Sequence, residues 1–243
     1  MKALLALVIV LALTSAPALA DSATDVGVLG AVAVGQHVGE GNPVPTNGVV
    51  PAALFEFTQH LNSVRLHIDA IPQVSLSGLS TGAYGRSSAS ASLLDAILMT
   101  DFGSHERFRL GAGAQVVNLS NYSGQNGETN SGRASGWLYS AASTLPLRSN
   151  HFVELQLYLV PNIRSNLQVF FQGVQQPTEP EQGAEVYYSA AYGWTRGRNT
   201  WLLGLSGLSY HTRNTDDGQL VDRNVGGAVT FEWRYRVGAR SGR

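Results

Sequence analysis

Three polar residues in the last fifth of the chain carry the functional groups that an acyl-transfer site requires. Ser209 and His211 lie two positions apart, so both side chains leave the same face of an extended strand, and Asp216 follows in the next loop. A hydroxyl nucleophile, an imidazole base and a carboxylate that orients the base make up such a site. These three residues are weak catalytic candidates, and we favour the interpretation that His211 is a polar residue at a strand end. We therefore assign no catalytic residue.

A second group with chemical potential lies much earlier in the chain. Arg65, His67 and Asp69 occupy alternate positions and therefore share one face of a strand. Histidine and aspartate are also metal ligands, but two ligands are too few to indicate a metal ion. We expect neither a metal nor another cofactor, and we favour a row of ion-paired side chains inside the fold.

Charged residues at alternate positions of other segments extend this row. The predicted interior set consists of Arg65, His67, Asp69, Arg107, Arg109, Glu154, Glu232, Arg234 and Arg236. If these groups pair across a narrow interior, each charge is compensated and the set closes the interior. If the interior is wide enough for water, they line a pore, and the excess of arginine then predicts a preference for anions.

The segment 225–237 indicates which kind of element holds such charges. Large apolar residues stand at every second position from Val229 to Val237, and Glu232 and Arg234 lie between them. This period of two indicates a strand with one apolar and one charged face. In a water-soluble sandwich the charged face would meet solvent. In a membrane barrel the apolar face meets lipid and the charged face meets the interior.

The same alternation recurs along the chain, and no long segment has a helical period. Expected strands span residues 25–36, 50–60, 63–74, 91–100, 107–118, 133–145, 151–160, 166–172, 186–194, 200–211 and 225–237. Expected polar loops span residues 38–48, 75–90, 122–132, 175–183 and 212–222. Strands near ten residues suit a tilted membrane crossing. Because bacterial single-chain barrels have an even number of strands, we predict ten, with twelve or eight as alternatives, and place the miscount between Arg133 and Gly183.

The first twenty residues have the features of a secretory signal. Lys2 is followed by an apolar run over residues 3–13, and Ala18-Leu19-Ala20 forms a small-residue cleavage site. The apolar run is shorter than the roughly 20 residues that a membrane anchor needs. We expect residues 1–20 to be a signal peptide for Sec-type export and residues 21–243 to form one barrel domain.

Composition excludes one class of partner. The formal net charge is −1, so there is no basic field of the kind that attracts nucleic acid. The chain has no cysteine, and a barrel closed by its own hydrogen bonds needs no disulfide.

The signal segment, the amphipathic strands and the aromatic residues Phe231, Trp233 and Tyr235 of the last strand together resemble small outer-membrane β-barrel proteins of Gram-negative bacteria. This group includes OmpA-like barrels and narrow porins. The resemblance implies an all-β, antiparallel, up-and-down transmembrane barrel in the cell outer membrane. It also implies contact with outer-membrane lipids and lipopolysaccharide, insertion by the barrel-assembly machinery, and a monomer. The chain departs from the group by continuing past Tyr235 to Arg243.

We predict a structural barrel or a passive, porin-like pore with a charged, arginine-rich lumen and no enzymatic activity. The first alternative is a lipid-modifying hydrolase centred on His211. Lipid A deacylases look loosely similar through a His-x-Ser-Asn element, but here Arg213 occupies the serine position, so their nucleophile cannot be carried over. The second alternative is a periplasmic lipocalin-like barrel with its apolar face inside and a bound lipid.

Residues 65–69 also invite comparison with outer-membrane proteases of the omptin type, which look like ten-stranded barrels with an Asp–His couple. Their sites lie at the extracellular rim. Here His67 and Asp69 follow a tight turn and should lie toward the periplasmic end, so we favour the ion-paired interior row.

Overall fold

The computed structural model describes residues 22–38, 44–61, 64–79, 86–102, 108–123, 128–175, 178 and 180–237. The predicted signal peptide, Arg107 and the tail 238–243 lie outside the described residues. No helix among the described residues is long and apolar enough to cross a membrane.

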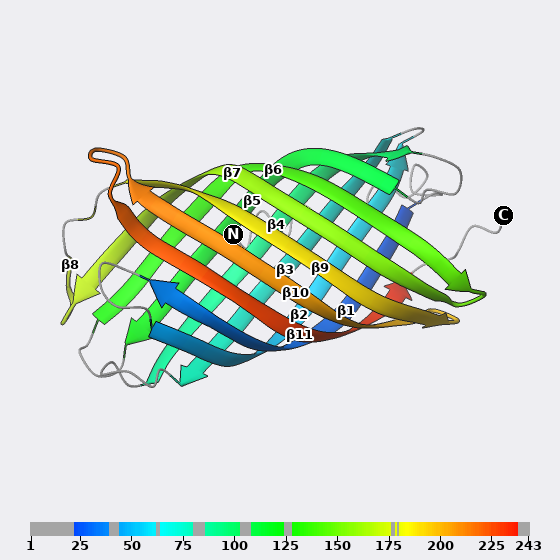
Figure 1. The fold of residues 1–243 in the computed structure, drawn as a ribbon, viewed down its shortest axis with the longest axis horizontal. Helices are drawn as coiled ribbons and strands as arrows, with labels where there is room; N and C mark the ends of the chain where they lie inside the picture. The colour runs from blue at the N-terminus through cyan, green and yellow to red at the C-terminus, as the bar shows by residue number, and fades with distance from the viewer. Residues whose placement is uncertain are drawn as a thin grey trace.

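The described chain forms one antiparallel sheet that closes on itself (Figure 1). Its strands are β1 (Ser22–Val38), β2 (Val44–Leu61), β3 (Val64–Leu79), β4 (Arg86–Phe102), β5 (Phe108–Ser123), β6 (Glu128–Arg148), β7 (His151–Phe171), β8 (Val174–Gln175), β9 (Glu181–Arg196), β10 (Asn199–Asn214) and β11 (Leu220–Val237).

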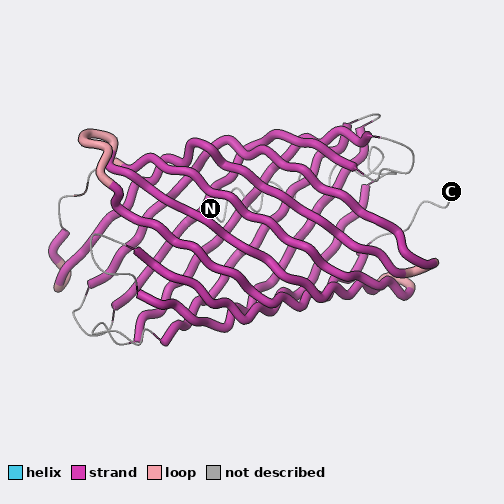
Figure 2. Tube along the Cα trace, viewed as in Figure 1, coloured by secondary structure: helices cyan, strands magenta, loops and turns pink. Residues whose placement is uncertain are grey.

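Each long strand pairs with the next long strand along the chain, and β1 pairs with β11 to close the wall. The strand β8 has only two residues and pairs with the end of β7. Eleven strands less β8 leave ten in the wall, which confirms the predicted strand number and the up-and-down architecture. Figure 2 shows the strands winding obliquely around the barrel.

The expected miscount lay in β7. Residues 151–160 and 166–172 were predicted as separate strands, but β7 runs from His151 to Phe171 without interruption. The register against β9 shifts between Val160 and Ile163, and the residue after Val160 is Pro161. A proline removes one ladder hydrogen bond, and a bulge accommodates that loss without ending the strand.

The strands are also longer than predicted. Parts of the expected loops 38–48, 75–90, 122–132, 175–183 and 212–222 belong to strands, as shown by the bounds of β2, β3, β4, β6, β9, β10 and β11. The long strands have 16 to 21 residues, whereas a membrane crossing needs about 9 to 11. Each glycine- and serine-rich segment forms backbone hydrogen bonds with a neighbouring strand. Local composition does not reveal which segments will have such a neighbour.

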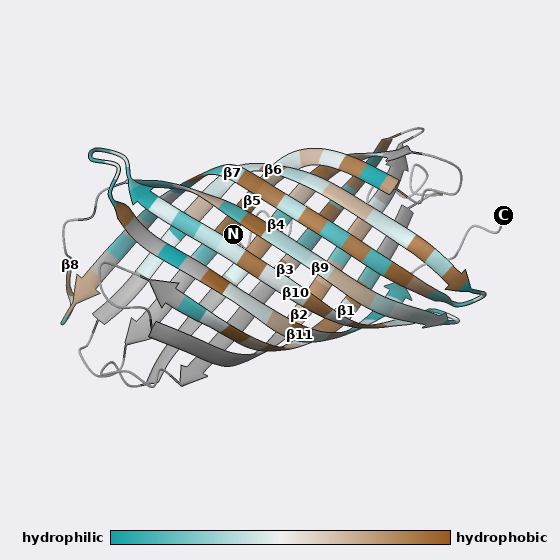
Figure 3. Cartoon of the chain, viewed as in Figure 1, coloured by the Kyte–Doolittle hydropathy of each residue, from teal (hydrophilic) through white to brown (hydrophobic). Residues whose placement is uncertain are grey.

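Apolar and polar residues alternate along the strands, and the apolar ones face outward. Figure 3 shows the alternation along β7, β10 and β11. Large exposed residues include Val32 of β1, Trp137 of β6 and Leu205 of β10. An outward apolar face is the arrangement that the segment 225–237 predicted for a membrane barrel, and it is the reverse of a lipocalin-like barrel with its apolar face inside.

The interior is partly filled by a compact apolar cluster. Its buried members are Ile97, Met99, Ala134, Leu138, Tyr158, Val160 and Ile163, which come from β4, β6 and β7. Tyr187 of β9, the strand that pairs with β7, and Tyr210 of β10 pack against it. The cluster therefore fills part of the interior beside these neighbouring strands.

The two ends of the barrel differ in their connections. The turns between β6 and β7 and between β9 and β10 contain two residues each, and both lie at the same end as the C-terminal end of β11 (Figure 1). The turn after Asn214 and the strand β8 lie at the other end. We call the first end the tight-turn end.

Candidate functional site

Arg234 is the centre of a charged group inside the barrel. Its Nε lies 3.3 Å from Oε2 of Glu56 on β2, and its Nη2 lies 3.3 Å from Oε1 of Glu154 on β7. The guanidinium also donates to both carboxylate oxygens of Glu232 on its own strand. The side chain of Arg234 is only 15% exposed. One cation thus contacts three carboxylates, which belong to three different strands.

These contacts reach across the interior. In the wall, β11 and β7 are separated by β10 and β9, so the contact between Arg234 and Glu154 spans two intervening strands. Two long hydrogen bonds also cross the interior. The Tyr158 hydroxyl donates to Oδ2 of Asp69 at 3.5 Å, and Nε2 of Gln115 donates to Oε1 of Glu185 at 3.5 Å.

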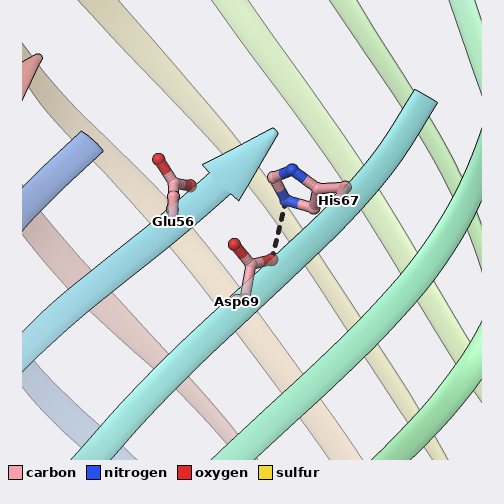
Figure 4. A group of neighbouring side chains, drawn as sticks. All are labelled: Glu56, His67 and Asp69. Carbon is pink, nitrogen blue, oxygen red and sulfur yellow. Dashed lines mark hydrogen bonds and ion pairs between the residues drawn. The ribbon is translucent and has the colours of Figure 1, made fainter. Parts of the chain in front are cut away.

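Glu56, His67 and Asp69 form a second group beside the first (Figure 4). Nε2 of His67 lies 2.9 Å from Oδ2 of Asp69, and Nδ1 lies 2.9 Å from the hydroxyl oxygen of Thr58. One ligand-type atom from each of Glu56, His67 and Asp69 lies within 4.8 Å of the other two. All three side chains are partly buried, and they come from the paired strands β2 and β3.

Two carboxylate oxygens in this region have no hydrogen-bond partner. They are Oδ1 of Asp69 and Oδ1 of Asp95, and both atoms are buried. Asp95 is only 1% exposed, and it lies directly opposite Asp69 in the pairing of β3 with β4. Oδ2 of Asp69 has partners in His67 and Tyr158, but two facing buried carboxylates that each have an unsatisfied oxygen are costly and favour a proton or a cation beside them.

The remaining residues of the predicted interior set are dispersed around this group. Arg65 is buried at 8% exposure, and Arg109 donates to the Thr144 hydroxyl at 3.1 Å. Arg236 forms two hydrogen bonds with Asp25 of β1, at 2.9 and 2.8 Å, but its side chain is 43% exposed near the end of β11.

Sequence reasoning missed Glu56 and left Asp95 out of the interior set. Asp95 was visible as a single acid opposite Leu94 and Leu98, and Glu56 as a single acid among apolar residues. Neither pattern reveals a partner. Only the closure of the sheet brings Glu56 to Arg234 and Asp95 beside Asp69.

The described interior carries more carboxylates than guanidinium groups. The inward-facing acids are Asp25, Glu56, Asp69, Asp95, Glu154, Glu185 and Glu232, and the inward-facing arginines are Arg65, Arg109, Arg234 and Arg236. The balance of charge is therefore the opposite of the arginine excess that the sequence suggested.

The three weak catalytic candidates lie elsewhere. Tyr210 packs against the interior cluster, so its neighbours Ser209 and His211 share the outward face with Leu205. Asp216 lies in the exposed turn after β10, where its backbone amide donates to Oδ1 of Asn214 at 2.8 Å. None of the side-chain contacts found among the described residues joins Ser209, His211 and Asp216.

Sequence comparison assigns no relatives. No family model matches this sequence. No curated protein matches it either.

Structural comparison finds barrels of bacterial outer membranes. The outer membrane protease OmpT of Escherichia coli superposes with a TM-score of 0.55 at 8% identity, covering 89% of this chain and 96% of OmpT. The COG4313 outer membrane channel of Pseudomonas putida F1 gives a TM-score of 0.47 at 11% identity, over 89% of this chain and 96% of the channel. The β domain of the Bordetella autotransporter BrkA gives 0.43 at 8% identity, over 86% and 98%.

The likeness to OmpT extends over almost the whole of both chains, but the sequences have diverged too far for it to carry an activity. The superposition shows a shared fold, which in this chain is a closed, ten-stranded, antiparallel wall with an apolar outer face. The chain has the fold of an outer-membrane β-barrel.

Proposed function

We propose that this chain is an outer-membrane β-barrel of the structural type, whose lumen is bridged by side chains toward the tight-turn end. In this proposal the protein spans the outer membrane after export, contacts outer-membrane lipids and lipopolysaccharide, is inserted by the barrel-assembly machinery and acts as a monomer. The charged interior closes the barrel rather than conducting solutes.

One observation carries the proposal. The guanidinium of Arg234 is held at once by Glu56, Glu154 and Glu232, which belong to β2, β7 and β11. A hydrated pore would leave these charges in water, whereas here they pair with one another across the interior. The apolar cluster around Leu138 narrows the interior beyond this charged group.

The charge balance also bears on ion preference. If the ion pairs of Arg234 broke and the lumen opened, the lumen would be lined mainly by carboxylates, and such a lining attracts cations. The proposal therefore replaces the anion preference expected from the sequence with a cation preference for any residual conductance.

Single-channel recording of the refolded mature chain in a planar bilayer tests the proposal. With insertion verified by protease protection, we expect the unmodified protein to give no sustained discrete conductance steps. Replacement of Arg234 by serine should produce them, because the variant lacks the bridging cation and leaves three carboxylates that attract water. The steps should be cation-selective.

Arg236→Ser provides the matched control. It removes an inward-facing arginine two positions along the same strand, but this arginine pairs with the single carboxylate of Asp25 and lies near the barrel end. We expect Arg236→Ser to remain as silent as the unmodified protein. Porin-sized steps from the unmodified protein would overturn the proposal of a bridged lumen.

A further inference from the structure

We propose that Glu56, His67 and Asp69 form a binding site for one divalent transition-metal ion of the zinc class inside the barrel. The inference goes beyond the structural role and does not depend on whether the lumen conducts.

The ligand atoms are of the right chemical types. Zinc is bound by imidazole nitrogen and by carboxylate oxygen, with metal–ligand distances of about 2.0 to 2.2 Å. One such atom from each of Glu56, His67 and Asp69 already lies within 4.8 Å of the others. In the proposed site, rotation of the three side chains on two adjacent, hydrogen-bonded strands brings these atoms to bonding distance of one ion. Three protein ligands leave a fourth position for water.

The unpaired carboxylate oxygens supply an independent reason for a cation. Oδ1 of Asp69 is buried and has no hydrogen-bond partner, and the same is true of Oδ1 of Asp95 opposite it. A buried carboxylate oxygen without a partner is unfavourable, and a divalent ion bound at Asp69 would give its Oδ1 a partner and reduce the repulsion from the facing Asp95. Figure 4 shows Glu56 and Asp69 projecting from β2 and β3 toward the same space as His67.

His67 is also held as a metal-binding histidine is held. Its Nδ1 lies 2.9 Å from the Thr58 hydroxyl, while its Nε2 points at Asp69. Metal-ligating histidines commonly donate their second ring N–H to an oxygen, which fixes the tautomer and orients the ring. In the structure Nε2 contacts the Asp69 carboxylate, which only accepts, so Nε2 donates a proton there. In the proposed site the ion replaces that proton, and Nδ1 then donates to the Thr58 hydroxyl.

Arg234 opposes a cation at this site but does not prevent binding. Its Nε lies 3.3 Å from Oε2 of Glu56, so it competes for that carboxylate. The charge of Arg234 is shared with Glu154 and Glu232, and the surroundings of the three ligands remain acidic overall.

Titration of the refolded, metal-stripped mature chain with Zn²⁺ tests the site by calorimetry, and Co²⁺ serves as an absorbing probe of coordination. We expect one ion per barrel and visible Co²⁺ bands of a four- or five-coordinate site. His67→Gln and Asp69→Asn should each weaken Zn²⁺ binding by more than 100-fold. Thr58→Val keeps the side-chain shape and removes only the orienting oxygen, so it should weaken binding by about 10- to 100-fold.

His151→Gln is the matched control. His151 is an exposed histidine that contacts the Tyr192 hydroxyl at 2.6 Å, so its loss should leave Zn²⁺ affinity unchanged. Folding of each variant is verified by its heat-modifiable migration in a detergent gel. The proposal is overturned if the folded parent binds no Zn²⁺, or if the folded Thr58, His67 and Asp69 variants bind it as tightly as the parent.

Discussion

At the scale of single residues, the interior is organised around charges that depend on one another. Arg234 contacts three carboxylates at once, those of Glu56, Glu154 and Glu232. Removing one partner from a buried ion group leaves the others uncompensated, and this costs far more than removing a partner from an exposed pair. Arg234 and Arg236 lie on the same face of the same strand and therefore allow a direct comparison.

We expect Arg234→Met to destabilise the folded barrel by about 3 to 5 kcal/mol, because Glu56, Glu154 and Glu232 lose their shared cation. Arg236→Met should lower the stability of the folded barrel by only about 0 to 1 kcal/mol, because the Arg236 side chain that pairs with Asp25 is 43% exposed. Urea unfolding in lipid vesicles, followed by tryptophan fluorescence, measures both. Equal losses for the two variants would contradict the assigned role of Arg234.

At this scale the sequence predicted on which face of a strand a charged residue lies, but not which residues it contacts. Alternation along 225–237 placed Glu232 and Arg234 on the face opposite Phe231, and the structure has them there. The contact of Arg234 with Glu56 joins residues far apart in the chain and depends on the pairing of β11 with β1 and of β1 with β2. Periodicity within one strand contains no information on that closure.

At the scale of strands, close approach of neighbours determines which residues are tolerated. Gly113 of β5 faces Ile97 of β4 in the pairing, and a Cβ atom at Gly113 would lie 1.9 Å from the backbone oxygen of Ala96. At Gly30 of β1 the nearest atom, the backbone oxygen of Phe231, would be 3.9 Å away. One glycine is required by sterics, and the other is not.

Gly113→Ala should therefore destabilise the barrel by about 1 to 3 kcal/mol, since β4 or β5 must shift to admit the methyl group. Gly30→Ala should change stability by less than about 1 kcal/mol, because the space is open and alanine reduces the freedom of the unfolded chain. The urea midpoints of the two variants in vesicles are the comparison to make. A well-tolerated Gly113→Ala would mean that β4 and β5 do not approach so closely.

Strand existence was predictable from sequence, whereas strand length was not. The ten wall strands all contain alternating segments that the pattern identified, and the count of ten was correct. Each expected loop contains the end of one strand and the start of another but is too long, and the one division that does not exist lies between residues 160 and 166, where β7 continues through Pro161. A neighbouring strand provides hydrogen-bond partners that outweigh weak local preference.

At the scale of the whole molecule, the barrel has an apolar outer face suited to lipid and packed side chains inside. All four tryptophans of the chain, Trp137, Trp194, Trp201 and Trp233, lie on the outward face by strand alternation. Trp137 is 68% exposed near the middle of β6. The other three lie within a few residues of the tight-turn end, where Trp194 stacks on Trp201 with ring centroids 5.8 Å apart. Such placement suits an interfacial aromatic girdle.

The most direct test is the quenching of tryptophan fluorescence by brominated lipids. The refolded mature chain is placed in vesicles whose acyl chains carry bromine either deep or near the headgroups, and single-tryptophan variants are compared. We expect Trp137 to be quenched most by deep bromine, and Trp194, Trp201 and Trp233 to be quenched most by shallow bromine. Fluorescence that brominated lipid leaves unchanged for all four would show that the apolar face does not meet a bilayer, and would contradict the account.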